Sequence, residues 1–257
     1  MRILVTRPAA QAQGWVTRLR ERGLDAQALP LIEIAEARDP PSLRAAWAAI
    51  SATRLVIFVS PNAAERFFAL RPQAAHWPSA TLAASPGPGT TQALLGLHVP
   101  RELIVEPAAD AAQFDSESLW ARLSSSDWHD TKVLCVRGDS GRDWLVERLR
   151  GAGAHVESVS AYQRVAPVLD ARERQLLDEA LSMPTRTLWW FSSSQAIDHL
   201  SALVPPGVDW SAARALVTHP RIASRARALG FGHVDETRPA SDDVLKAMER
   251  SIQSAAP

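Results

Sequence analysis

Two stretches in different halves of the chain, Ile3-Leu4-Val5-Thr6-Arg7 and Val133-Leu134-Cys135-Val136-Arg137, share one pattern from which the fold class can be inferred. Each is a short apolar run that ends in an arginine. The first run precedes Trp15, Leu19 and Gly23, and the second precedes Trp144, Leu149 and Gly153. A buried strand followed by an amphipathic helix is typical of α/β proteins. The repeated pattern therefore predicts an internal duplication.

The similarity between the two halves extends over further segments. Phe58-Val59-Ser60-Pro61-Asn62-Ala63 resembles Phe191-Ser192-Ser193-Ser194-Gln195-Ala196, and Thr90–Gly96 resembles Ala223–Gly230. A duplicated half predicts two similar lobes with a cleft between them, and such clefts commonly bind small molecules.

Short apolar runs alternate with helical patterns along the whole chain, which implies parallel sheets and right-handed crossovers. The predicted strands or extended segments are 3–5, 28–34, 55–59, 81–84, 103–105, 133–136, 156–165, 188–191, 215–217 and the surroundings of Val234. The predicted helices are 11–22, 43–50, 63–70, 90–95, 116–123, 144–149, 171–181, 194–203, 222–229 and 242–252.

The repeat is compatible with two divisions into lobes. In a simple division each repeat forms its own lobe. In a swapped division the first strand-helix-strand unit of each repeat joins the remainder of the other repeat, and residues 28–35 and 159–166 cross between lobes. The repeat spacing alone leaves both divisions open.

Composition excludes several classes of protein. The 257 residues are 46% hydrophobic and 22% charged, as in ordinary globular proteins. Lys+Arg and Asp+Glu both number 28, which argues against a bulk nucleic-acid binder. There is no signal-peptide pattern and no apolar stretch of about 20 residues, so we expect a cytoplasmic protein that contacts no membrane. The single cysteine, Cys135, is expected to be a buried strand thiol.

Familiar catalytic and cofactor motifs are absent from the sequence. It contains no Walker spacing, no complete dinucleotide fingerprint, no CxxC pair and no Gly-x-Ser-x-Gly elbow. No histidine pair has metal-binding helical spacing. We therefore expect either a binding module or an enzyme whose chemistry needs neither a nucleophile nor a cofactor.

Polar residues follow the predicted strands, at the edge where parallel sheets bind ligands. Several of them directly precede helices, whose N-termini favour anions. Together they suit a ligand with several carboxylates or phosphates. Ser60 and Ser193 are equally consistent with simple helix caps, and Arg142 with a surface ion pair. The candidate binding residues are Arg7, Ser60, Asn62, Thr90, Arg137, Arg142, Arg164, Ser192, Ser193, Ser194 and Arg221.

These segments, in this order, resemble the uroporphyrinogen-III synthase family over nearly the full length of the chain. The resemblance rests on Val5-Thr6-Arg7-Pro8, residues 58–63, Gly87-Pro88-Gly89-Thr90, Arg137-Gly138 with Gly141-Arg142, Tyr162-Gln163-Arg164, residues 191–194, and Arg221-Ile222-Ala223 before Gly230-Phe231. Two segments depart from the family pattern. Ser85-Pro86 stands where many members have Val-Gly, and His219-Pro220-Arg221 replaces a glycine-rich loop.

The resemblance implies two flavodoxin-like parallel-sheet lobes that arose from a swapped duplication and are joined by a two-stranded linker. Lobe 1 would comprise residues 1–35 and 167–257, and lobe 2 residues 36–158. The linker strands would be 28–35 and 159–166.

The implied reaction converts hydroxymethylbilane to uroporphyrinogen III. The linear tetrapyrrole loses its terminal hydroxyl as water, and the last ring closes inverted through a spiro intermediate. The family uses no cofactor and no metal. Tyr162, the only tyrosine of the chain, matches the tyrosine that the family is thought to use as a hydrogen-bond donor to the departing hydroxyl. Thr90 matches a family threonine, while the serines, Asn62 and the arginines would contact the substrate.

The resemblance further implies a monomer in transient contact with the preceding pathway enzyme. The alternative is a non-enzymatic module that binds small anions, because it would have the same two-lobed fold and the same anion-favouring loops. A nucleotide-sugar transferase is disfavoured because the lobes are small and the sequence has no metal-binding Asp-x-Asp.

Overall fold

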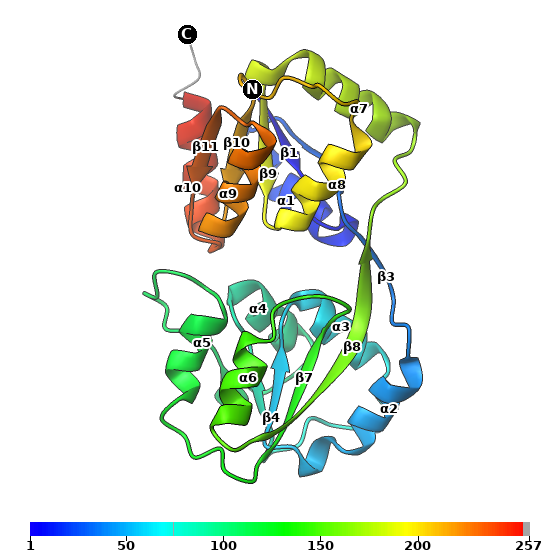
Figure 1. Cartoon of the computed structure of the whole chain (residues 1–257), viewed down its shortest axis with the longest axis vertical. Helices are drawn as coiled ribbons and strands as arrows, with labels where there is room; N and C mark the ends of the chain where they lie inside the picture. Colours follow the sequence, from blue (N-terminus) through cyan, green and yellow to red (C-terminus); the bar gives the residue numbers. More distant parts are fainter. Residues whose placement is uncertain (74, 254–257) are drawn as a thin grey trace. The chain divides into compact units, whose positions relative to one another are not determined.

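A computed structural model describes residues 1–73 and 75–253. The chain divides into two compact α/β units (Figure 1). Unit 1 contains residues 1–33 together with the described residues after 164, and unit 2 contains residues 34–164. Unit 1 is therefore built from both ends of the chain, whereas unit 2 is continuous.

The sheet of unit 1 has the strand order β11-β10-β9-β1-β2, and each pair of neighbouring strands in it is parallel. Its strands are β1 (Arg2–Val5), β2 (Ala26–Ala28), β9 (Thr187–Phe191), β10 (Arg214–Val217) and β11 (His233–Glu236). Its helices are α1 (Ala9–Glu21), α7 (Ala171–Ser182), α8 (Ser194–Leu203), α9 (Pro220–Leu229) and α10 (Ser241–Gln253), and a 3₁₀ turn, η3 (Pro184–Arg186), precedes β9.

The sheet of unit 2 has the order β3-β8-β7-β4-β5-β6, with β4 through β8 joined in parallel. Its strands are β3 (Glu33–Glu36), β4 (Leu55–Phe58), β5 (Leu82–Ala84), β6 (Ile104–Val105), β7 (Lys132–Gly138) and β8 (His155–Val165). Its helices are α2 (Pro40–Ala48), α3 (Pro61–Ala69), α4 (Pro88–Gly96), α5 (Ser116–Leu123) and α6 (Trp144–Gly151), with 3₁₀ turns η1 (Ile50–Ala52) and η2 (Arg101–Leu103).

Strand pairing shows how the two repeats combine. β1 pairs with β9, with Leu4 opposite Trp189, and β7 pairs with β4, with Cys135 opposite Ile57. The first strand of each repeat thus lies beside a strand of the other repeat, as in the swapped division. The predicted α/β class, with parallel sheets in two lobes, is confirmed. The single extended segment expected at 28–34 is instead the end of β2 and the start of β3, which belong to different sheets.

The core of unit 1 covers both faces of its sheet because neighbouring strand residues point to opposite faces. Trp190 packs on the side of α1, where its ring centroid lies 4.4 Å from that of Trp15. Trp189 contacts an aromatic pair on the other side, Trp210 and Phe231, whose centroids are 4.8 Å apart. Two consecutive tryptophans therefore contribute to the core on opposite faces of the sheet.

The core of unit 2 is also aromatic. Trp47 of α2 stacks on Phe67 of α3, and its indole nitrogen donates to the Phe67 carbonyl at 2.6 Å. Tyr162 belongs to the same apolar cluster. Cys135 is buried, as predicted, and burial raises the pKa of its thiol to about 11. Across residues 1–73 and 75–253, no helix combines the length and apolarity that crossing a membrane requires.

Two glycines of unit 1 should respond oppositely to substitution by alanine. A Cβ at Gly232 would lie 1.8 Å from the carbonyl oxygen of Ser211, whereas a Cβ at Gly14, within α1, would meet nothing within 4 Å. We expect Gly232→Ala to lower the free energy of unfolding by about 1–3 kcal/mol. Gly14→Ala should raise it by about 0.5–1 kcal/mol. Urea titrations followed by circular dichroism would measure both, and shifts of equal sign would contradict the packing described here.

Candidate active site

The predicted site residues lie at the carboxyl edges of the two sheets. In unit 2, β4 leads through Ser60 into α3, and β5 leads through Gly87 into α4. Gly138 ends β7, and Tyr162 and Arg164 lie near the end of β8. The parallel arrangement thus gathers Ser60, Gly138, Tyr162 and Arg164 at one edge, which is where open α/β sheets bind their ligands.

Tyr162 is completely buried, and its hydroxyl is hydrogen-bonded on two sides. The phenol oxygen lies 2.9 Å from Oγ of Ser60, and an Nη of Arg164 donates to it at 3.0 Å. The guanidinium also lies 5.6 Å from the centre of the phenol ring. Ser60 caps α3, because its Oγ accepts from the backbone N–H of Ala63 at 3.2 Å. Ser60 is therefore both a cap and a partner of Tyr162.

Gly138 allows the phenol to lie directly against the backbone of β7. A Cβ at this position would come within 3.0 Å of the phenol Cζ and 3.3 Å of its oxygen. The β7–β8 register shifts between Arg137 and Gly138, so that Gly138 lies opposite Tyr162. The next backbone N–H, of Asp139, donates to the Tyr162 carbonyl at 3.0 Å. This glycine is needed for the close approach of a ring, a purpose that the sequence pattern did not reveal.

Ser85 stabilises the turn before α4, although from the sequence it only stood out as a departure from the family pattern. Its hydroxyl is fully buried and donates to the carbonyl of Gly87 at 2.7 Å. Thr91 lies 3.0 Å from Ser85 Oγ and 2.5 Å from Glu106. This network fixes the first turn of α4 and buries Thr90 there. A serine two residues before a glycine is a recognisable turn signal and could have been identified from sequence.

Among the predicted site residues of unit 1, Arg7 has the surroundings that best suit an anion-binding cation. It directly follows β1, its Nε donates to Oε1 of Gln11 at 3.1 Å, and its guanidinium lies 5.8 Å from the Trp190 ring. No ion pair to Arg7 is found within the described part of the chain. Burial lowers the pKa of Arg7 to about 10, so the side chain is still a cation at pH 7. A half-buried cation without a carboxylate partner is well suited to bind an anion.

Three serines precede or begin α8 in the same unit. Ser193 occupies the N-cap position, but its side chain makes no capping hydrogen bond. Ser192, Ser193 and Ser194 are all half-buried. They surround a helix N-terminus, which favours negative charge. At α9 the capping acceptor is His219, whose Nδ1 accepts from the backbone N–H of Arg221, while the Arg221 residue itself is exposed.

Two of the predicted arginines form ion pairs within the chain. Arg137 pairs with Asp143, and Arg142 pairs with Glu117. The Arg137 side chain is only 14% exposed, whereas that of Arg142 is 45% exposed. A carboxylate ligand would therefore compete with an internal partner at both positions. Asn62 lies half-buried in the first turn of α3.

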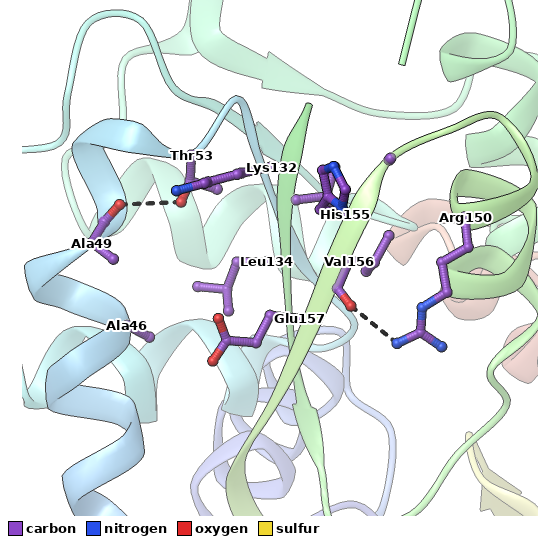
Figure 2. Close-up of a pocket in the computed structure, with 11 residues that line it drawn as sticks. Ala46, Ala49, Thr53, Lys132, Leu134, Arg150, His155, Val156 and Glu157 are labelled. Atoms are coloured by element: carbon purple, nitrogen blue, oxygen red, sulfur yellow. Dashed lines mark hydrogen bonds between the residues drawn. The ribbon is translucent and has the colours of Figure 1, made fainter. Parts of the chain in front are cut away.

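A pocket of about 570 Å³ lies elsewhere in unit 2, at the amino ends of β7 and β8 (Figure 2). Figure 2 shows Ala46 of α2 and Ala49, which directly follows α2, on one side and Arg150 on the other, where Arg150 donates to the Val156 carbonyl at 3.0 Å. None of the predicted site residues lines this pocket. It is separate from the polar edge described above.

A model of the family described as "Uroporphyrinogen-III synthase HemD" matches residues 13–246 of the chain. The chain belongs to the uroporphyrinogen-III synthase family. It is 31% identical to the uroporphyrinogen-III synthase of Salmonella typhimurium over 251 residues, covering 95% of this chain and 98% of that protein. The Escherichia coli enzyme of the same name is 30% identical over the same shares of each chain.

Solved structures of uroporphyrinogen-III synthases have a similar fold. A mutant from Thermus thermophilus gives a TM-score of 0.60 at 15% identity, covering 99% of both chains. The Helicobacter pylori protein gives 0.58 at 13% identity, covering 97% of this chain and 98% of that one. At these identities the likeness supports the architecture alone.

The contact between Gly138 and Tyr162 can be tested directly, because the chain has a single tyrosine. Incorporated 3-fluorotyrosine should give one fluorine resonance. Gly138→Ala should shift it, since the added methyl would force the phenol away from Ser60 and Arg164. Gly151→Ala, where a Cβ meets nothing within 4 Å, is the matched control and should leave the resonance in place. An unchanged resonance in Gly138→Ala would refute this close contact.

Proposed function

We propose that this protein is a uroporphyrinogen-III synthase, which cyclises hydroxymethylbilane with inversion of the last pyrrole ring and loss of water. The observation that carries the proposal is the family match over residues 13–246, together with relatives of the same name that align over nearly the whole chain. The comparisons give no support to the alternative of a non-enzymatic anion-binding module.

The chemistry of the carboxyl edges agrees with this substrate, a linear tetrapyrrole with many carboxylates. In unit 1, Arg7 and the serines at the start of α8 offer one unpaired cation and a helix N-terminus. In unit 2, the starts of α3 and α4 contribute Ser60, Asn62 and Thr90. We propose that these groups bind carboxylates or pyrrole N–H groups. Arg137, Arg142 and Arg221 are further candidates for carboxylate pairing.

The catalytic task is largely one of orientation. Once the terminal hydroxyl has left as water, the substrate carries an electrophilic carbon. The last ring can attack it directly, which gives the type I isomer, or through its substituted carbon, which gives the spiro intermediate. An enzyme that holds the chain near the second geometry favours the type III product by orientation. Tyr162 is the proposed source of the proton that helps the hydroxyl to leave.

Location, oligomeric state, cofactor use and partner are also matters of proposal. We propose a cytoplasmic monomer that works without cofactor or metal, in transient contact with the preceding enzyme of the pathway. Size-exclusion chromatography with light scattering would test the monomer.

The activity can be tested with freshly generated hydroxymethylbilane. After incubation, the product is oxidised and its isomers are separated by chromatography. We expect the type III isomer with the protein and the type I isomer in the buffer control. Type I alone in both samples would refute the proposed function.

Arg7→Gln should weaken substrate binding more than turnover. A charge-assisted hydrogen bond is worth about 1.5–3 kcal/mol, so we expect KM to rise about tenfold or more while kcat changes little. Arg18→Gln is the matched control, because Arg18 also lies over a tryptophan of unit 1, at 5.7 Å from Trp15, but is exposed. Equal KM values for both variants would remove Arg7 from the binding site.

A further inference from the structure

Three side chains of unit 2 form a hydrogen-bonded chain whose direction can be deduced. Arg164 has only donors, so the phenol oxygen of Tyr162 must accept from it. At the other end, Oγ of Ser60 accepts from the backbone N–H of Ala63. The remaining question is which hydroxyl donates in the 2.9 Å contact between Tyr162 and Ser60.

The complete burial of Tyr162 indicates which of the two hydroxyls donates. If Ser60 donated, the phenol hydrogen would need another acceptor, yet Tyr162 is 0% exposed and its hydroxyl contacts no other acceptor within the described residues. Buried donors are almost always satisfied. If Tyr162 donates to Ser60, the phenol hydrogen has an acceptor, and the Ser60 hydrogen is available for a further acceptor. Ser60 is 9% exposed and Tyr162 is 0% exposed, so of the two hydroxyl-bearing residues only Ser60 reaches the surface, where a ligand could bind.

We infer that Ser60 delivers the proton to the departing hydroxyl, that Tyr162 acts through Ser60, and that Arg164 is the positioning residue of this chain. The inference rests on the proposed function and deepens it. It also changes the role expected for Arg164, from pairing with a substrate carboxylate to holding and polarising the phenol.

The proton transfer balances as follows. The Ser60 O–H bond breaks while a new O–H bond forms on the substrate hydroxyl, and the C–O bond breaks so that water leaves with its electron pair. Ser60 regains a proton from Tyr162, and the neighbouring guanidinium of Arg164 stabilises the negative charge on the phenol oxygen. The reaction releases one water in total, so ring closure must expel one proton from the substrate. That proton passes to Ser60, which returns its own hydroxyl proton to the phenol oxygen of Tyr162.

Double-mutant cycles would test whether Tyr162 acts through Ser60 and Arg164 through Tyr162. The readouts are kcat and KM for formation of the type III isomer. Ser60→Ala and Tyr162→Phe should each lower kcat about tenfold or more. The double variant should lose no more than the larger single loss, because residues that act in one hydrogen-bonded relay act as a unit. Arg164→Gln should lower kcat with KM unchanged, and should add nothing in the Tyr162→Phe background. Arg164→Lys, which keeps a donor and the charge, should recover part of the loss.

Two controls separate this role from stability. Asp39→Ala removes a comparable cap, since Asp39 accepts from the backbone N–H of Ser42 at 3.2 Å, and should leave kcat unchanged. Arg44→Gln changes an exposed arginine of the same unit and should have no effect. If Ser60→Ala does not fold, the double-mutant cycle of Arg164→Gln with Tyr162→Phe still tests the inference. Arg164 is outside the apolar core, so its substitution should leave the protein folded.

Two outcomes would overturn the inference. One is losses for Ser60→Ala and Tyr162→Phe that multiply in the double variant, which would mean that the two groups act independently. The other is an Arg164→Gln variant with raised KM and unchanged kcat, as expected for a carboxylate ligand. A wild-type protein that yields only the type I isomer would instead refute the proposed function itself.

Discussion

The pairing of β1 with β9, and of β7 with β4, is the constraint on which the rest of the molecule depends. It assigns the first strand of each repeat to a sheet made mainly of the other repeat. Both sheets then have the same order of corresponding strands, β2-β1-β9-β10-β11 and β8-β7-β4-β5-β6. The carboxyl edge of each sheet consequently combines loops from both halves of the sequence, as Ser60 and Tyr162 illustrate in unit 2.

Much of the fold could be predicted because the apolar periodicity is strong. Runs such as Leu55–Phe58 and Thr187–Phe191 are buried along their whole length, as central parallel strands require. The strand partners were not predictable in this way. Both divisions of the repeat bury the same residues, so hydrophobic pattern cannot distinguish them, and only the pairing seen in the structure does. The roles of residues 28–35 and 159–166 as linkers stay a prediction.

The candidate site was only partly visible in the sequence. Its residues were identified by position after strands, but their contacts were not, since a hydrogen bond such as that of Arg164 with Tyr162 depends on the side-chain geometry at the end of β8. An ion pair of Arg142 was one interpretation of the sequence, but its partner could not be inferred, because Glu117 is distant in the sequence. The need for glycine at position 138 comes from the phenol of Tyr162, which lies against it, and the sequence alone does not show this contact.

The discontinuous composition of unit 1 has a consequence for synthesis of the chain on the ribosome. Unit 2 is continuous, so it can fold once residues 34–164 have emerged. β1 precedes unit 2 in the chain and can pair early with β2, but its other neighbour, β9, begins only at Thr187, so one edge of β1 stays open until then. Such long-range pairing is slow and leaves strand edges open to aggregation. The open edge of β1 is therefore a place where the nascent chain can pair wrongly before β9 is made.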